Sequence, residues 1–382
     1  MTETLSPRAL EARRSRLSRV REGMESSGVD ALLLSHGADL PWLTGYRAMP
    51  LERLTLLVLP LVGDPVLVVP GLEAPRVPDT DGLVGLQPWS DDVDPLDLVV
   101  DLVAGARSGR FALSDRAWAT TALALQRRLP DARWVEASTV TAPIRAVKDQ
   151  AEIAALRAAG AAADRVALVL QSGAIPLVGR TEAAVSADLG ALLIAEGHSA
   201  VNFAIVGSGP NAASPHHEPG DRIIGRSETV VCDFGGALSL DGDVGSCSDI
   251  TRTIVTGDPS PEVTACYDVL QAAQRSAVGS AVAGVTAASV DAVAREAIDG
   301  AGYGHLFVHR TGHGIGIEEH EDPYLVVGND ETLVPGHAFS VEPGIYEPGR
   351  FGMRLEDIVV IGADGRPEPL NTVDHGLVVV DR

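Results

Sequence analysis

Three histidines, three glycines and three glutamates are concentrated in the segment HRTGHGIGIEEHE, residues 309–321. The whole chain holds ten histidines, so this clustering points to a functional site. His309 and His313 are four residues apart and would share one face of a helix. The alternating glycines oppose a helix, because each would cost a helix interior roughly 1 kcal/mol relative to alanine. We therefore expect a strand or tight loop whose backbone packs closely against its surroundings.

Four acidic residues fall on runs of sequence that are typical of β-strands. Asp233 follows the apolar residues of ETVVCDFGG, and Asp249 lies at the start of the alternating run SDITRTIV. Further along the chain, Glu342 precedes the Pro-Gly turn of HAFSVEPGIY. Glu356 shares a strand face with Arg354 in MRLEDIVVI. We expect all four carboxylates to face inward.

Inward-facing carboxylates need positive partners, because burying isolated charges costs several kcal/mol per ion even after relaxation. Arg252 and Arg354 are close enough in sequence to form ion pairs, which is one alternative. Four acids against two arginines leave a surplus of negative charge that divalent cations would neutralise. Carboxylates with one imidazole suit Mn(II), Co(II), Fe(II) or Zn(II), and the donors suffice for two ions. Paired ions that bridge a water are typical of hydrolases, so we favour a dinuclear hydrolytic site.

An internal repeat relates the two acidic pairs. The segment GRTEAAVSADLGALLIAEG, residues 179–197, aligns without gaps on GVTAASVDAVAREAIDGAG, residues 284–302. Thr181 and Thr286 would be equivalent helix starts, and the final glycines of the two segments equivalent helix stops. Alanine and glycine are abundant here, so a chance match is the alternative. One acidic pair follows each copy at nearly the same offset, which favours two similar halves.

The length of 382 residues predicts two domains. The formal net charge of -22 and the pI near 4.7 predict no nucleic-acid partner, because phosphate binding needs clustered lysine and arginine. Lys148 is the only lysine. Cys232, Cys247 and Cys266 form no CxxC pair, which predicts reduced, buried thiols rather than disulfides or a cysteine-based zinc site.

The N-terminal part is predicted to be a mixed α/β domain. Residues 8–27 have the apolar spacing of an amphipathic helix. The runs DALLL, TLLVLP, PVLVV, RFALS and RWVEAS predict strands, and a second helix is expected near residues 118–129. After TAPIRAVKDQAEI the sequence becomes alanine-rich and helical. We place the domain boundary near residue 145.

The sequence shows no signal for export or membrane insertion. The stretch MTETLSPRALEARRSRLSR lacks the apolar core of a signal peptide, and no apolar run is long enough to span a membrane. We therefore expect a cytoplasmic protein without a membrane partner.

The motifs DFGG, SDITRT, HRTGHGIG, EEHEDPY, VEPGIY and RLED, in this order, resemble those of the pita-bread metallopeptidases. The Xaa-Pro dipeptidase (prolidase) and aminopeptidase P group is the most similar, and the resemblance extends to LLLSHGADLPWLTGY in the N-terminal part. It implies a creatinase/prolidase-like α/β domain over residues 1–145. It also implies an α+β pita-bread catalytic domain with pseudo-twofold halves over residues 146–382, and a homodimer.

The resemblance implies a ligand set for two divalent ions, with Mn(II) favoured and Co(II), Zn(II) or Fe(II) as alternatives. Glu342 would also take a proton from a metal-bridged water and pass it to the leaving nitrogen. The implied ligands are Asp233, Asp249, His313, Glu342 and Glu356.

The resemblance also implies substrate-facing roles for His216, His309 and His320, which would steady the tetrahedral intermediate. His217 is the less favoured neighbour of His216, and Arg354 would orient carboxylates. The glycines of HRTGHGIG would let the backbone approach the metals and the substrate closely. The implied reaction is hydrolysis of Xaa-Pro bonds, with dipeptides favoured. The alternative is an Xaa-Pro aminopeptidase that acts on longer peptides.

Two departures from the family pattern bear on this interpretation. The turn GGALSLDGDVGSCS between Asp233 and Asp249 is longer than usual. Asp241 and Asp243 therefore compete as ligands, although the flanking glycines favour a solvated hairpin tip. The loop VVGNDETLVPG before Glu342 lacks a basic residue, whereas some prolidases place there an arginine that grips the dipeptide carboxylate. Dipeptidase and aminopeptidase P therefore both stay open.

Other proteins with this fold fit the motifs less well. A creatinase-like, metal-free hydrolase has no need for five ligand positions. A non-enzymatic binding protein on the same fold would need neither the ligands nor the histidines. Methionine aminopeptidase is disfavoured by the additional N-terminal domain.

Overall fold

The protein is described by a computed structural model that covers residues 5–240 and 244–381. The chain divides into two compact units, Met1–Arg145 with Leu240–Val244, and Ala146–Ser239 with Gly245–Arg382. The alternative ligands Asp241 and Asp243 lie outside the described residues. Across the described ranges, helices that combine the length and apolar character needed for a membrane span are absent.

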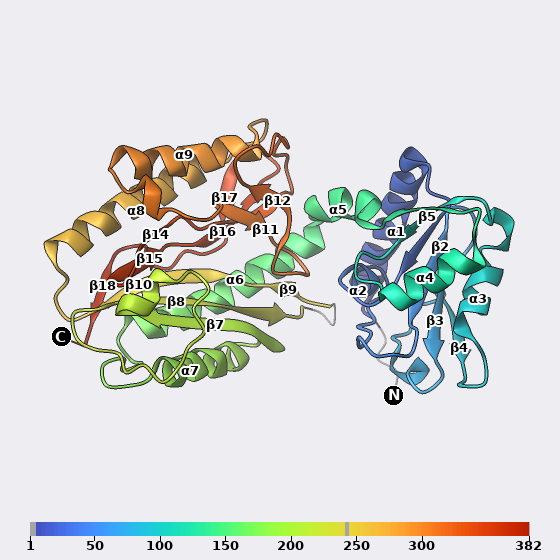
Figure 1. The fold of residues 1–382 in the computed structure, drawn as a ribbon, viewed down its shortest axis with the longest axis horizontal. Helices are drawn as coiled ribbons and strands as arrows, with labels where there is room; N and C mark the ends of the chain where they lie inside the picture. Colours follow the sequence, from blue (N-terminus) through green and yellow to red (C-terminus); the bar gives the residue numbers. More distant parts are fainter. Residues whose placement is uncertain (1–4, 241–243, 382) are drawn as a thin grey trace. The chain divides into compact units, whose positions relative to one another are not determined.

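The N-terminal unit contains a six-stranded mixed sheet and flanking helices (Figure 1). Its strands are β1 (Ala31–Leu34), β2 (Leu56–Pro60), β3 (Val66–Pro70), β4 (Gly85–Trp89), β5 (Arg110–Leu113) and β6 (Arg133–Glu136). Its helices are α1 (Pro7–Ser27), α2 (Asp39–Thr44), α3 (Pro95–Leu102), α4 (Ala119–Arg128) and α5 (Ser138–Ala146). The strand order is β4-β3-β2-β1-β5-β6, with β1 antiparallel to β2 and parallel to β5.

The elements predicted for this unit are confirmed. Helix α1 begins after the capping Ser6, ends at Gly28 in a left-handed conformation (φ 63°), and buries Leu17, Val20 and Met24. The five predicted strands correspond to β1, β2, β3, β5 and β6. Strand β4 was not predicted, because its residues GLQPW are largely exposed and form no apolar run.

The second unit contains two larger sheets and a hairpin. The first sheet has the order β18-β10-β8-β7, with β9 paired to β8, and the second has the order β12-β11-β13-β16-β17. The first contains β7 (Ala200–Ser208), β8 (Thr229–Leu238), β9 (Ser246–Cys247), β10 (Ile250–Thr256) and β18 (Val378–Val380). The second contains β11 (Gly312–Gly314), β12 (Glu321–Leu325), β13 (Ala338–Val341), β16 (Asp357–Ile361) and β17 (Pro367–Pro369), and the hairpin is β14 (Gly344–Glu347) with β15 (Phe351–Arg354).

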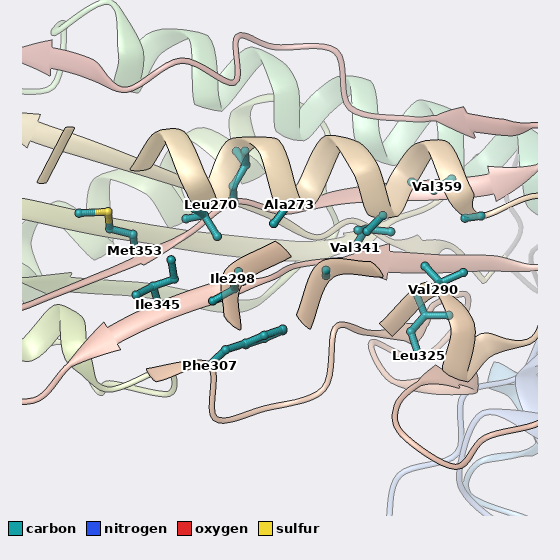
Figure 2. Packing of buried hydrophobic residues seen from close by; sticks show 14 of the residues in the cluster. Leu270, Ala273, Val290, Ile298, Phe307, Leu325, Val341, Ile345, Met353 and Val359 are labelled. Carbon is teal, nitrogen blue, oxygen red and sulfur yellow. The ribbon is translucent and has the colours of Figure 1, made fainter. Parts of the chain in front are cut away.

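Helices cover each of these sheets. Helices α6 (Gln150–Gln171) and α7 (Glu182–Ala195) pack on the first sheet. Helices α8 (Pro261–Ser280) and α9 (Ala287–Gly300) pack on the second sheet and the hairpin (Figure 1). Figure 2 shows the apolar cluster that joins α8 and α9 to these strands, and its labelled members are Leu270, Ala273, Val290, Ile298, Phe307, Leu325, Val341, Ile345, Met353 and Val359. The α+β fold with two similar halves agrees with the prediction.

The internal repeat corresponds to equivalent helices in the two halves. Thr181 caps α7 by accepting a hydrogen bond from the Ala184 backbone, and Thr286 caps α9 in the same way from Ser289. The predicted stops Gly197 and Gly302 both follow the helices with positive φ, 104° and 89°. The repeat is therefore structural, and the chance match is excluded.

A buried arginine joins the two halves behind the predicted acidic residues. Thr251 of β10 forms an isolated β-bridge with Glu356 of the second half. Next to it, Arg252 is fully buried and donates hydrogen bonds to the Glu356 carbonyl at 2.7 Å and to Asp357 Oδ1 at 2.8 Å. The backbone around Glu356 is therefore held by a strand of the other half. The predicted buried, free state of the three cysteines is confirmed.

Candidate functional site

The four predicted carboxylates come from strands of both halves. Asp233 lies within β8, and Asp249 immediately precedes β10. Glu342 follows the last residue of β13, and Glu356 lies between β15 and β16 at its bridge to Thr251. Three of the four acids therefore take their direction from the end of a strand rather than from its middle.

All nine side chains predicted for the site line one cavity of about 450 Å³. They are His216, Asp233, Asp249, His309, His313, His320, Glu342, Arg354 and Glu356. The sequence analysis missed five further lining residues, which are Phe203, Ile205, Pro215, Arg310 and Glu319. Arg310 and Glu319 lie inside or beside quoted motifs, whereas nothing in the pattern of β7 distinguished Phe203 and Ile205 from core residues.

Three donor groups lie especially close together. Asp249, His313 and Glu356 each offer one ligand atom, and these atoms lie within 4.8 Å of one another. Burial, reinforced by repulsion from Glu356, raises the pKa of Asp249 well above its usual range. Burial and repulsion from Glu342 do the same to the pKa of Glu356, and burial raises the pKa of Glu342 to about 7. The cluster therefore favours a positive charge at its centre.

The donor set fits a cation in a second respect. The Oδ1 atoms of Asp233 and Asp249 are both buried without a hydrogen-bond partner in the described part of the chain. Buried polar atoms are normally satisfied, and an orphaned carboxylate oxygen is costly. A metal ion among these oxygens would supply the missing partner.

The hydrogen bond made by Nδ1 of His313 leaves Nε2 available as a metal ligand. Its Nδ1 lies 3.0 Å from the Gly314 carbonyl oxygen, so we assign the ring proton to Nδ1. Its Nε2 then carries a lone pair and lies 3.3 Å from Glu342 Oε1 and 3.7 Å from Asp249 Oδ2. Burial, aided by repulsion from His320, lowers the pKa of His313 to about 3. The neutral ring with a free Nε2 is the form that binds metal ions.

Arg354 is buried and orients two of the carboxylates. Its Nη2 donates to Asp233 Oδ2, and its Nε donates to Thr251 Oγ1 at 3.0 Å. Thr251 in turn donates to Glu356 Oε2 at 2.6 Å. Arg252, the second arginine considered as a partner, pairs with Asp357 instead. Arg354 and Arg310 are the two arginines that line the cavity beside the four predicted acids, which leaves a surplus of negative charge as the sequence predicted.

His309 borders the cavity, but both of its ring nitrogens are engaged within the protein. Nδ1 lies 2.7 Å from the Arg310 carbonyl oxygen, and Nε2 lies 2.9 Å from the Tyr346 hydroxyl. Burial lowers the pKa of His309 to about 4, with repulsion from Arg354 adding to it. The ring is therefore neutral, with Nδ1 donating and Nε2 accepting from Tyr346. Tyr346 also accepts a hydrogen bond from Arg354 Nη1 at 2.9 Å.

His216 and His217 face different surroundings. His216 lines the cavity, whereas Nε2 of His217 donates to Oε2 of Glu182 at 2.7 Å. Glu182 is fully buried at the start of α7 and also accepts from the Ser208 backbone and hydroxyl, at 2.8 and 2.7 Å. This carboxylate therefore anchors the segment that carries His216, and the preference for His216 over His217 agrees with the geometry.

Asp291 anchors the corresponding segment of the second half. It is fully buried in α9, and its Oδ1 accepts from the Thr311 backbone at 3.1 Å and from the Thr311 hydroxyl at 2.8 Å. It also pairs with Arg295, whose Nη2 donates to the His309 carbonyl at 3.0 Å. Neither Glu182 nor Asp291 was predicted, because the segments that they hold, at Ser208 and Thr311, are 26 and 20 residues away in the sequence.

The glycines of HRTGHGIG meet neighbouring chain segments. A Cβ on Gly312 would overlap the Ser340 carbonyl oxygen, and one on Gly314 would overlap the carbonyl oxygen of Asp322. The predicted strand with closely packed backbone is confirmed, since residues 312 to 314 form β11. Gly312 and Gly314 therefore lie against the backbone of β13 and of the start of β12. This close packing is itself a reason for glycine at both positions.

The sequence matches two known families in succession. Residues 16–147 match the creatinase/prolidase N-terminal domain, and residues 153–363 match metallopeptidase family M24. The probable dipeptidase PepE of Mycobacterium tuberculosis is 45% identical over 96% of both chains. The Xaa-Pro dipeptidase of Lactobacillus helveticus is 33% identical over 91% of this chain and 95% of its own.

A solved structure shares the fold over nearly the whole chain. The dipeptidase PepE of Mycobacterium ulcerans superposes with a TM-score of 0.90 at 45% identity, covering 97% of this chain and 98% of that one. The resemblance to pita-bread metallopeptidases and the predicted fold class are therefore confirmed. Family M24 enzymes use divalent metals, and the cluster of Asp249, His313 and Glu356 can hold one. The chain belongs to metallopeptidase family M24 and carries a creatinase/prolidase N-terminal domain.

Proposed function

We propose that this protein hydrolyses Xaa-Pro peptide bonds with the help of two divalent metal ions, and that Xaa-Pro dipeptides are its preferred substrates. The observation that carries the proposal is the convergence of five donor side chains from both halves on one cavity. The relative named Xaa-Pro dipeptidase supports the substrate class. Residues 146–382 would form the catalytic domain and residues 1–145 the N-terminal domain. A homodimer and a cytoplasmic location remain predictions.

The residues of the cavity fit a pair of metal ions. Four carboxylates and one neutral imidazole suit Mn(II), which we propose first, with Co(II), Zn(II) or Fe(II) as alternatives. When bound, such ions polarise the scissile carbonyl group and lower the pKa of a water. The proposed ligands are Asp233, Asp249, His313, Glu342 and Glu356.

The remaining side chains would handle protons and developing charge. Glu342, whose Oε1 lies 3.1 Å from Ser340 Oγ, would take a proton from the attacking water and deliver it to the proline nitrogen. His216 and His320 would donate hydrogen bonds to the carbonyl oxygen as it becomes negative. His309 would act together with Tyr346, since the two are hydrogen bonded and Arg354 holds the tyrosine.

Arg310 is our candidate for the cation that the loop VVGNDETLVPG lacks. It lines the cavity, and its guanidinium carbon lies 4.5 Å from the centre of the Tyr324 ring. A dipeptide has its carboxylate one residue beyond the scissile bond, so a guanidinium beside the site would favour dipeptides over longer peptides. Planar guanidinium groups bind carboxylates in a fixed geometry.

The deciding experiment compares a dipeptide with a tripeptide. Metal-free enzyme is reloaded with Mn(II), its metal content is measured, and kcat/KM is determined for Ala-Pro and Ala-Pro-Ala. We expect hydrolysis of both and a preference for Ala-Pro. A clear preference for Ala-Pro-Ala would reassign the protein as an Xaa-Pro aminopeptidase. Metal-loaded enzyme that cleaves neither peptide would reject the proposed function.

A further inference from the structure

A buried ion pair lies close to the cavity without belonging to its lining. Lys148 Nζ lies 2.6 Å from Oε2 of Glu321, 173 residues away in the sequence. The two side chains are 1% and 5% exposed. Such a pair is held tightly, because separation would leave an uncompensated charge away from water. The pair therefore fixes the position of the chain at Glu321.

Glu321 closes the turn between β11 and β12. It is the first residue of β12 and lies opposite Gly314 of β11. While Oε2 meets the lysine, Oε1 accepts a hydrogen bond from the Glu318 backbone at 2.9 Å. Glu319 and His320 lie between these two contacts, and both line the cavity. The carboxylate of Glu321 therefore sets the conformation of the turn that brings them there.

The backbone around Lys148 is attached to a different part of the site. The Lys148 amide donates to the Gly336 carbonyl at 2.9 Å, and Val147 forms a β-bridge with His337. Residues 336 and 337 lead directly into β13, which delivers Glu342. Lys148 thus connects the segment before Glu342 with the turn that carries His320.

The ion pair packs directly against the backbone of Gly316. A Cβ on Gly316 would lie 2.8 Å from both Lys148 Nζ and Glu321 Oε2. Lys148 is also the only lysine among the 30 lysine and arginine residues of the chain. A guanidinium is broader and planar, so arginine is not equivalent at such a site. The only lysine of the chain therefore lies at a site where an ammonium group and a guanidinium are not interchangeable.

We propose that Lys148 and Glu321 are positioning residues whose ion pair holds the turn of Glu319 and His320 against the cavity. Neither residue of the pair is among the lining residues of the cavity. The inference rests on the proposed function, because His320 is expected to meet the substrate carbonyl oxygen. The pair would then be required for turnover more than for folding or for binding of metal.

The first test removes both charges together. The variant Lys148→Met/Glu321→Gln removes both charges of the pair, whereas either single change leaves one charge of the pair without the other. We expect a folded enzyme with wild-type metal content, a kcat on Ala-Pro lowered by roughly tenfold or more, and a much smaller change in KM. The control is Arg157→Met/Glu368→Gln, which removes a bidentate pair that is 47% and 44% exposed. The control should keep wild-type kcat.

The second test uses the single lysine as a reporter and needs no variant of the pair. Wild-type protein grown with lysine labelled by carbon-13 at Cε gives one lysine signal. We expect His320→Ala to shift this signal through the turn, and the exposed His305→Ala to leave it unchanged.

Two outcomes overturn the inference. One is a folded double variant with wild-type kcat, and the other is a lysine signal that His320→Ala does not move. Failure of the proposed function is distinguishable from both, since wild-type enzyme would then cleave neither peptide while the lysine signal could still report the coupling to His320.

Discussion

Glu182 and Asp291 are fully buried acids near the start of equivalent helices in the two halves, about one helical turn apart in the alignment of the repeat. Each lies in the first turns of the second helix of its half, and each holds a segment that carries a cavity histidine. Glu182 does so through Ser208 and His217, and Asp291 through Thr311 and Arg295. Each half therefore supports the site with a buried acid of its second helix, although the two acids do not align in the repeat.

We predict that Glu182→Gln lowers both stability and kcat while metal content is retained. The carboxylate accepts hydrogen bonds from Ser208 and His217. An amide would turn an N–H group toward one of these donors, which should cost about 1–3 kcal/mol of folding free energy. Thermal unfolding, metal analysis and kcat on Ala-Pro measure the effect. Glu262→Gln is the matched control, because its pair with Arg350 is about half exposed. Unchanged kcat in a destabilised Glu182→Gln protein would show that the His216 segment does not depend on this acid.

Removal of metal is predicted to abolish hydrolysis, and Mn(II) or Co(II) to restore it. Asp249→Asn and Glu356→Gln should each lower the metal bound per chain, because both residues supply an oxygen to the tight donor cluster. Metal content is measured by elemental analysis after dialysis, beside Glu262→Gln. Full activity of chelator-treated, metal-free enzyme would contradict the assignment.

The metal-free protein is predicted to lose thermal stability as the pH rises from about 6.5 to about 8. Burial raises the pKa values of Asp249, Glu342 and Glu356, that of Glu342 to about 7. An acid whose folded pKa exceeds its unfolded value stabilises the protein at low pH, and this stability is lost as the pH rises through the folded pKa.

Histidines set the lower limit of that pH window. Burial lowers the pKa values of His309 and His313 from 6.5 to about 4 and about 3. Below pH 6.5 these histidines therefore make stability rise with pH, whereas the acids make it fall. Above 6.5 they are largely neutral in both states. Melting temperature as a function of pH, with and without Mn(II), measures the effect. The slope should flatten with metal and in metal-free Glu356→Gln, and an equal slope in all samples would refute the prediction.

Replacement of Arg310 is predicted to affect dipeptides more than tripeptides. Arg310→Met should lower kcat/KM for Ala-Pro by an amount equivalent to about 1.5–3 kcal/mol, the usual range for a hydrogen bond to a charged group. The loss for Ala-Pro-Ala should be smaller, since its carboxylate lies one residue further away. The control Arg275→Met changes an exposed arginine of α8. Equal losses on both peptides would assign Arg310 a role other than binding the dipeptide carboxylate.

Local patterns, together with the family resemblance, identified most of the residues that line the cavity. Strand patterns predicted the four inward carboxylates, and the resemblance to the pita-bread metallopeptidases implied the other five side chains. The structure brings all nine to one cavity. The repeat predicted equivalent helices because Thr181 and Thr286 are local capping signals.

Contacts between distant segments could not be read in the same way. Glu182 meets His217 across 35 residues and Lys148 meets Glu321 across 173, and neither separation leaves a periodic signal. The need for glycine at position 312 also comes from a neighbouring strand, because a side chain there would overlap the Ser340 carbonyl oxygen of β13. Sequence patterns and the family resemblance thus predicted most of the cavity lining, whereas the residues that hold the lining in place could be identified only from the three-dimensional arrangement.

The division of donors between the halves has a consequence for the autonomy of each half. Asp233 in β8 and Asp249 just before β10 belong to the first half, whereas His313, Glu342 and Glu356 belong to the second half. A chain cut between β10 and α8 would give one fragment with two carboxylates and another with three donors, each with its acidic surface facing solvent. Neither fragment encloses the cavity alone, so reassociation of the fragments and tight uptake of the ions should occur as one event.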